Sequence, residues 1–236
     1  MTRHKKTARK SNPPVKLEGT NLLIHPKYND QTADCVLISS DGYIFFVASH
    51  FVLSARIEFV DSQIEHSSII YFFLDLATGT DETKSYDDPY EISNLLEFCR
   101  KWIVSNTIRQ AALGKLLAFE DLGDMVFAFV LALKHDAKDL AMKLLPQLEK
   151  CTWSSDQDGG IVIDKHVLDP IYMPPGYFQC LPRLYVWCLG RAAREWMEDG
   201  GSFKDMLEDA ILIWNEQKPG RYPNYYPDLV VNDEDA

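Results

Sequence analysis

The chain has 236 residues, of which 46% are hydrophobic and 25% are charged, and this composition is typical of a globular protein that buries its own core. Its five cysteines are an odd number and none belongs to a CxxC pair, so no disulfide framework is expected. A reducing, intracellular compartment, the cytoplasm or the nucleus, is predicted. No apolar run reaches the roughly 18 to 20 residues of a membrane helix, so neither a membrane span nor a secretory signal is expected.

The charge is unevenly distributed along the chain. The formal net charge is −11, from 24 basic and 35 acidic residues, yet the first 16 residues hold six basic residues and no acidic one. The acidic remainder repels phosphate groups, so the folded body is not expected to bind nucleic acid. Residues 1–20 offer little to bury and are predicted to form a disordered basic arm. Such an arm serves as a nuclear import signal, an electrostatic tether or a solubilising tail.

A β-hairpin is predicted soon after ordered structure begins near Leu22. Two runs rich in β-forming residues, 35–39 and 43–47, flank the dipeptide Asp41-Gly42, whose glycine can adopt the positive φ of a tight turn. A short helix is expected over 49–54, and the apolar run 67–74 is interpreted as a buried third strand. Residues 75–91 are rich in acidic side chains and are expected to form an exposed loop.

Helical periodicity predicts most of the elements after residue 91. Apolar residues recur at helical spacing over 92–103, 122–133 and 137–148, and 125–133 is apolar on nearly every face, as in a central helix. Pro146 is expected to kink or end the third of these helices. A domain boundary is predicted after Lys150, at the polar linker 154–160, and a short strand is expected over 161–163. Two later stripes, 181–196 and 203–214, predict a helical hairpin around Gly200-Gly201.

The C-terminal tail, 218–236, is rich in Pro, Tyr and acidic residues and is expected to be loosely held. Its tyrosines, Tyr222, Tyr225 and Tyr226, alternate with prolines. This pattern is compatible with a linear motif that docks in a partner's groove, and equally with a segment that lies over the helical region before it.

No constellation of residues indicates catalysis. The chain has no GxSxG turn to present a nucleophile, its six histidines are widely separated, and no glycine-rich loop opens a helix as a phosphate site requires. Cys188 lies on an apolar helical stripe and is expected to be a buried core residue. No catalytic, cofactor-binding or metal-ligating residue is therefore predicted, no cofactor is expected, and the chain is not expected to be an enzyme. The alternative from that class is a small enzyme whose site is assembled from scattered residues.

Three blocks of sequence share an order and spacing with a known family. The stretch from Ala33 to Val47, followed by Val52-Leu53-Ser54, combines an Asp, an alternating strand, an Asp-Gly hairpin and a strand that runs into a helix. Residues 95–99 read Leu-Leu-Glu-Phe-Cys, and 119–137 contain Leu133-Lys134-His135-Asp136. These blocks resemble the opening of BTB/POZ domains, particularly the fungal type, and the family's "LLxFxY" and "LxxLLxLAxKYD" helices.

The chain departs from the family pattern at a few positions. Ala48 and Ser49 stand where the family has His followed by Arg or Lys, and Arg100 stands where the helix block has Tyr. In dimeric members that basic residue faces the Asp that Asp34 matches. Asp34 is therefore a protein-interface candidate that lacks its expected counter-charge. Leu22, Leu23 and Ile24 are the other predicted interface candidates.

The resemblance implies a mixed α+β fold, with a BTB/POZ-like small β-sheet flanked by helical hairpins and a helical C-terminal extension. The expected organisation is a basic arm over 1–20, the BTB/POZ-like domain over 21–150, the helical extension over 151–217 and the acidic tail over 218–236.

The function that the resemblance implies is a non-enzymatic protein–protein interaction module. Its expected partners are proteins: a second copy in a homodimer, or a cullin scaffold. A scaffold for homo- or hetero-association and an adaptor of a ubiquitin ligase are both left open. The alternative is a transcription or chromatin-associated regulator that uses the basic N-terminal arm.

Overall fold

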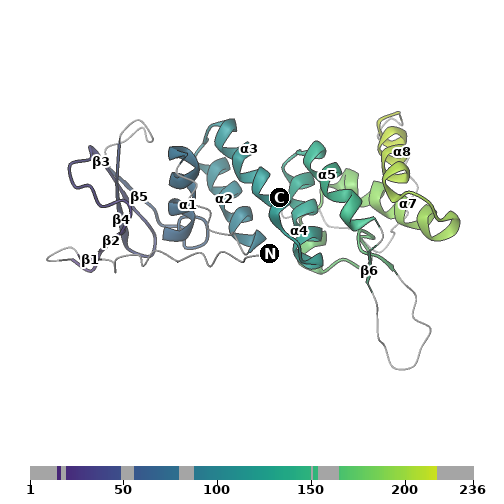
Figure 1. Ribbon diagram of the computed structural model, residues 1–236, viewed down its shortest axis with the longest axis horizontal. Coiled ribbons are helices and arrows are strands. Elements are labelled where there is room, and N and C mark those ends of the chain that lie inside the picture. Colours follow the sequence, from purple (N-terminus) through teal and green to yellow (C-terminus); the bar gives the residue numbers. More distant parts are fainter. Residues whose placement is uncertain are drawn as a thin grey trace, which may run out of the picture. The chain divides into compact units, whose positions relative to one another are not determined.

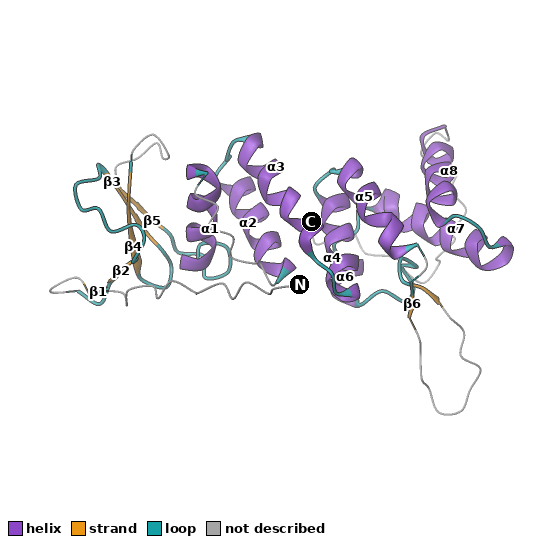
Figure 2. Cartoon of the chain, in the orientation of Figure 1, coloured by secondary structure: helices purple, strands orange, loops and turns teal. Residues whose placement is uncertain are grey.

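The computed structural model describes residues 15–16, 20–48, 56–79, 88–149, 151–153 and 165–216, which form two compact units (Figures 1 and 2). The first unit ends at Ala112, and the second begins at Leu113 and also includes 87–89. The short helix predicted over 49–54, the linker 154–160, the strand 161–163, the tail 218–236 and most of the basic arm lie outside the described residues.

The first unit contains a mixed five-stranded sheet in the order β1-β2-β4-β3-β5. Its strands are β1 (Val15–Lys16), β2 (Leu23–Ile24), β3 (Cys35–Ile38), β4 (Tyr43–Val47) and β5 (Arg56–Glu58). β3 and β4 form the predicted antiparallel hairpin, while β2 runs parallel to β4 and β5 parallel to β3. Gly42 has φ +84° in the hairpin turn, as the Asp-Gly dipeptide predicted. Val15 and Lys16, placed by the sequence in the disordered arm, instead pair with β2.

The interpretation of 67–74 as a strand is wrong, because these residues belong to helix α1 (Ser67–Thr78). His66 caps its N-terminus, and Gly79 ends it in the left-handed conformation at φ +65°. The apolar residues of this run are buried, and an unbroken apolar run does not by its periodicity distinguish a buried strand from a buried helix. The predicted loop 75–91 is shorter than expected, since 75–78 extend α1 and 89–91 begin the next helix.

Two helices follow α1 in the first unit. Helix α2 (Pro89–Lys101) confirms the predicted apolar stripe, with Ile92, Leu95 and Leu96 fully buried. Helix α3 (Asn106–Gly114), which periodicity did not predict, contains the division between the two units, and the 3₁₀ helix η2 (Lys115–Ala118) continues from it. The described residues thus combine a small mixed sheet with helices, which confirms the mixed α+β class.

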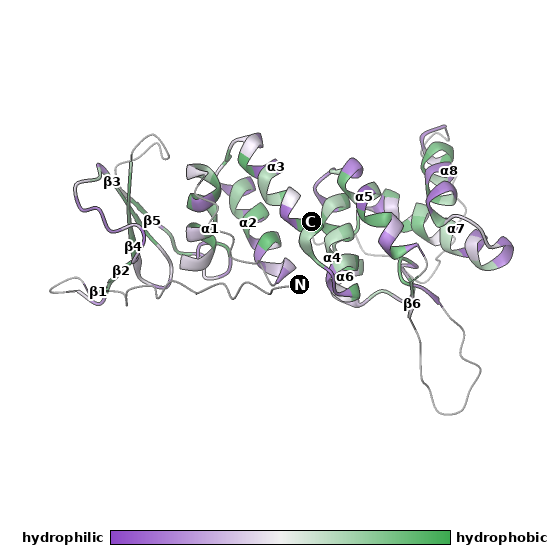
Figure 3. Cartoon of the chain, viewed as in Figure 1, coloured by the Kyte–Doolittle hydropathy of each residue, from purple (hydrophilic) through white to green (hydrophobic). Residues whose placement is uncertain are grey.

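The second unit is built on α4 (Leu122–Lys134), which is buried from Met125 to Leu133 and is its predicted central helix. Figure 3 shows the predominantly hydrophobic character of this helix. Helix α5 (Lys138–Leu148) packs on α4 and has Pro146 in its last turn, close to the predicted end. Because α5 also contacts α8, the helices on both sides of Lys150 belong to one compact unit. The division of the chain into units therefore does not fall after Lys150.

The remaining elements of the second unit, within the residues that the structure describes, are two short strands and three helices. These are β6 (Thr152–Trp153), β7 (Lys165–His166), α6 (Pro175–Phe178), α7 (Arg183–Asp199) and α8 (Phe203–Glu216). Helices α7 and α8 form the predicted hairpin around Gly200 and Gly201, which have φ values of +66° and +105°. None of the helices in the described ranges is long and apolar enough to cross a bilayer.

A buried histidine joins the strands of the second unit to its helices. The ring of His166 stacks on Phe203 at 3.7 Å between centroids and meets Trp196 edge-on. Its Nδ1 accepts the N–H of Leu168, which places the ring proton on Nε2, where it is donated to the Glu149 carbonyl at 3.1 Å. Burial lowers the pKa of His166 to about 4, against the weaker opposing effect of the Glu149 carbonyl. The folded chain therefore holds this ring neutral.

This neutral ring makes stability depend on pH. Unfolded His titrates near 6.5, so between pH 6.5 and pH 4 only the unfolded chain binds the proton, and stability falls as pH falls through this window. Linkage gives a loss of about 3 kcal/mol for this group. In denaturant unfolding from pH 7 to pH 4, the His166→Gln variant should lack this part of the decline. Parallel pH profiles for the two proteins would contradict the assignment.

Candidate functional site

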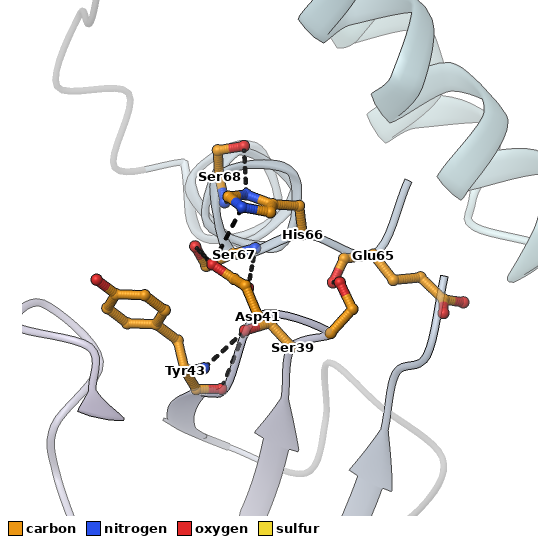
Figure 4. Close-up of polar contacts among 8 residues, drawn as sticks. Ser39, Asp41, Tyr43, Glu65, His66, Ser67 and Ser68 are labelled. Carbon is orange, nitrogen blue, oxygen red and sulfur yellow. Dashed lines mark hydrogen bonds and ion pairs between the residues drawn. The ribbon is translucent and has the colours of Figure 1, made fainter. Parts of the chain in front are cut away.

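A polar junction fastens the hairpin turn of the first unit to the start of α1 (Figure 4). Asp41, in the turn, accepts the N–H of Ser67 at 2.9 Å and its hydroxyl at 2.7 Å. The Nε2 of His66 lies 3.2 Å from the second oxygen of Asp41. Burial raises the pKa of Asp41, but hydrogen bonds from Ser39 and Ser67 outweigh this and hold it below its usual value.

An Asp, a His and a Ser in contact invite comparison with a catalytic relay. His66 Nδ1, however, accepts the backbone N–H of Ser68 at 3.4 Å, two residues along, and lies 3.3 Å from its hydroxyl. This is the geometry of a helix N-cap, in which the side chain satisfies an amide that has no partner within the helix. The junction therefore stabilises the first turn of α1 and fixes it to the sheet.

Glu65 lies next to this junction, and its carboxylate points away from Asp41 (Figure 4). The side chain is fully buried, accepts three hydrogen bonds and forms one ion pair. Oε2 accepts the backbone N–H groups of Val60 and Asp61 at 2.9 and 2.7 Å. Oε1 accepts Nε1 of Trp102 at 3.0 Å and lies 2.8 Å from Nζ of Lys101. Burial raises the pKa of Glu65, but these donors outweigh it, so the pKa lies below the ordinary value near 4.5.

The groups that Glu65 holds carry an exposed apolar surface. Val60 is 85% exposed, Trp102 is 41% exposed, and Ile103, the next residue, is 91% exposed. Phe59, which directly precedes Val60, packs edge to face on Trp102 at 5.2 Å between ring centroids. We refer to Val60, Trp102 and Ile103 as the Trp102 surface.

Ile103 adopts an unusual backbone conformation. It follows α2 in a Schellman motif, in which Val104 N–H bonds the carbonyl of Cys99 and Ile103 N–H that of Arg100. The motif requires a positive φ, and Ile103 has φ +51°. Glycine normally occupies this position, and a β-branched residue there costs on the order of 1–2 kcal/mol. The Ile103 side chain is also exposed, so within the folded chain it gains no hydrophobic free energy that could offset this strain.

The predicted interface residues do not form one cluster. Leu22 and Leu23 are partly buried beside the hairpin turn, and Ile24 is buried in the core. Asp34 is exposed and precedes the Cys35–Val47 pair, whereas Leu23 pairs with Tyr43. These ends of the hairpin are about 15 Å apart at strand rise per residue. An interface role for these four residues stays a prediction, and the Trp102 surface was not predicted from the sequence.

A second buried carboxylate was also missed. Asp75 on α1 accepts hydrogen bonds from Nζ of Lys27 at 2.7 Å and from the hydroxyl of Tyr28 at 2.8 Å. Burial lowers the pKa of Lys27, but the Asp75 carboxylate has the larger effect, and the pKa lies above its usual value. Burial and Asp75 both raise the pKa of Tyr28. This pair fixes the segment after β2 against α1. The sequence signal for this buried carboxylate was the position of Asp75, directly after the apolar run 69–74.

Among the described residues, no group of three or more His, Cys, Asp and Glu side chains is placed to hold a metal ion. In comparisons with known proteins, no protein-family model, no curated protein and no solved structure matches this chain.

Removing the charge of Glu65 tests whether this carboxylate organises the residues around it. Glu65→Gln removes the charge that the Lys101 ammonium and two backbone amides share. Because Lys101 is 40% exposed and water replaces part of this interaction, the substitution should lower the free energy of unfolding at pH 7 by about 1–3 kcal/mol. Because the folded pKa of Glu65 is depressed, its contribution is present above pH 4.5 and is lost as pH falls below that value. Denaturant unfolding of both proteins at pH 7 and at lower pH measures the difference.

The matched control is Glu97→Gln, which removes the exposed i,i+3 ion pair with Arg100. This substitution should cost less than about 1 kcal/mol at pH 7. Equal destabilisation by the two substitutions would show that Glu65 does not organise its surroundings.

Proposed function

We propose that the chain is a non-enzymatic protein–protein interaction module of the BTB type. It works as a scaffold for homo- or hetero-association or as an adaptor of a ubiquitin ligase, with a second copy or a cullin as partner. The observation that carries this proposal is the Trp102 surface. Val60 and Trp102 donate hydrogen bonds to the buried carboxylate of Glu65, and they and Ile103, the residue after Trp102, expose apolar side chains.

The arrangement of the chain supports the BTB resemblance. The first block of resemblance falls on β3 and β4, the second on α2, and the third spans α4 and the turn after it. A small mixed sheet followed by helices is the architecture that the resemblance implies.

The energetics of the Trp102 surface support a binding role. Single exposed apolar residues are common on protein surfaces. Here two exposed β-branched residues and a tryptophan lie at or next to groups that bond the Glu65 carboxylate. Ile103 adds backbone strain to exposure, and strained residues concentrate at functional sites. A partner that covers Ile103 and Trp102 recovers the hydrophobic free energy that the isolated chain leaves unused, on the order of 1.5–3 kcal/mol for a large side chain. Tryptophan is also enriched among residues that dominate interface energetics.

Ile103→Gly separates binding from stability. Glycine accepts φ +51° without strain, so the variant should be as stable as the unaltered protein or more stable by about 1 kcal/mol. It lacks the apolar side chain, so it should recover markedly less partner. The measurement is affinity capture of the tagged full chain from its native lysate, with an untagged copy as reporter of self-association, quantified by mass spectrometry.

The control is Leu212→Asn, an exposed leucine on α8 in the second unit, which should leave recovery unchanged. Loss of a cullin in the Ile103→Gly capture identifies the adaptor, and loss of the untagged copy identifies the self-associating scaffold. Equal recovery by Ile103→Gly and the unaltered chain would contradict a binding role for this surface.

A further inference from the structure

A second exposed surface, in the second unit, carries a lysine. Strand β7 consists of Lys165 and His166, and His166 is locked in the core by Phe203, Trp196 and the Glu149 carbonyl. Successive residues of a strand point to opposite sides, so anchoring His166 inward directs Lys165 outward. The position of the lysine is therefore fixed by the core.

A thioether and an aromatic ring lie near the ammonium of Lys165. Its Nζ lies 3.9 Å from the sulfur of Met197 and 5.0 Å from the ring centroid of Tyr172. Both residues are 43% exposed, and Ile171, next to Tyr172, is 56% exposed. The backbone that presents Ile171 is held by Asp169, whose carboxylate accepts the Ile171 N–H at 3.0 Å. We refer to Lys165, Ile171, Tyr172 and Met197 as the Lys165 surface.

The ammonium of Lys165 forms no salt bridge with the part of the chain that the structure describes. Asp169, the acid on which Lys165 acts electrostatically, is buried, and its carboxylate accepts the Ile171 N–H. Arg194 acts on the same carboxylate. A thioether and an aromatic face are weak partners for an ammonium, and a carboxylate is a stronger one.

We propose that the Lys165 surface binds a peptide segment in which an Asp or Glu lies beside an apolar side chain. The carboxylate pairs with Nζ of Lys165, and the apolar side chain packs on Tyr172, Met197 and Ile171. Charge complementarity selects this occupant, because an apolar partner without an acid would cover the ammonium and leave it buried and unpaired. This site is distinct from the Trp102 surface and gives the module a second kind of partner.

Two matched peptide pools test the proposal on the full chain. One fluorescein-labelled pool has a fixed Asp flanked by varied apolar residues, and the other has Asn in place of Asp. Fluorescence anisotropy should show binding of the Asp pool, with binding of the Asn pool weaker by about tenfold or more, because a charge-assisted bond is lost. Lys165→Met keeps the length of the side chain and should weaken binding of the Asp pool to the same extent, whereas Lys165→Arg should retain it.

Lys143→Met, an exposed lysine on α5 in the same unit, is the control and should bind like the unaltered chain. Ile103→Gly should also bind the Asp pool normally, because Ile103 belongs to the other unit. A loss of peptide binding therefore tests the Lys165 surface alone, and a loss of partner recovery by Ile103→Gly tests the proposed function. Three outcomes overturn the proposal: no binding of the Asp pool at millimolar peptide, equal binding of the two pools, or unchanged binding by Lys165→Met in a protein that melts like the unaltered chain.

Discussion

The buried carboxylate of Glu65 joins three parts of the first unit. A charge removed from water has to be satisfied by close donors. Glu65 obtains two of them from the neighbouring turn at Val60 and Asp61, and two from the end of α2, at Lys101 and Trp102, which is distant in sequence. Its backbone carbonyl also accepts the N–H and the hydroxyl of Ser40, in the hairpin turn. One residue thereby joins the sheet, the entry to α1 and the end of α2.

This arrangement explains how exposed apolar residues are kept in a defined position. The indole of Trp102 is held by its hydrogen bond to Glu65 and by the edge of Phe59, and Ile103 is fixed by the Schellman motif that ends α2. A surface ordered before binding loses less conformational entropy when a partner arrives. The same network that stabilises the fold thus holds the Trp102 surface in place for association. Ile103 keeps an exposed apolar side chain there at a cost in backbone strain, which is consistent with a binding role.

The sequence predicted those parts of the fold that repeat with a clear period. The hairpin around Gly42, the helices α2, α4 and α5 and the α7–α8 hairpin all follow from alternation or helical spacing. The interpretation of 67–74 as a strand was wrong because a helix that is buried on most sides has no polar face to mark its period. Glu65 and Trp102 are 37 residues apart, and His166 and Phe203 are also distant in sequence, so nothing local announces these contacts. Both surfaces arise from such long-range contacts, which is why the sequence did not reveal them.

The most direct test of the central claim is amide hydrogen exchange of the full chain, alone and in the complex recovered by affinity capture. If the Trp102 surface is the interface, exchange slows on binding over 57–66 and 98–104, the segments joined by Glu65. Slowing confined to 20–24 and 34–38, where Leu22, Leu23 and Asp34 lie, or an absence of slowing in the first unit, would contradict the claim.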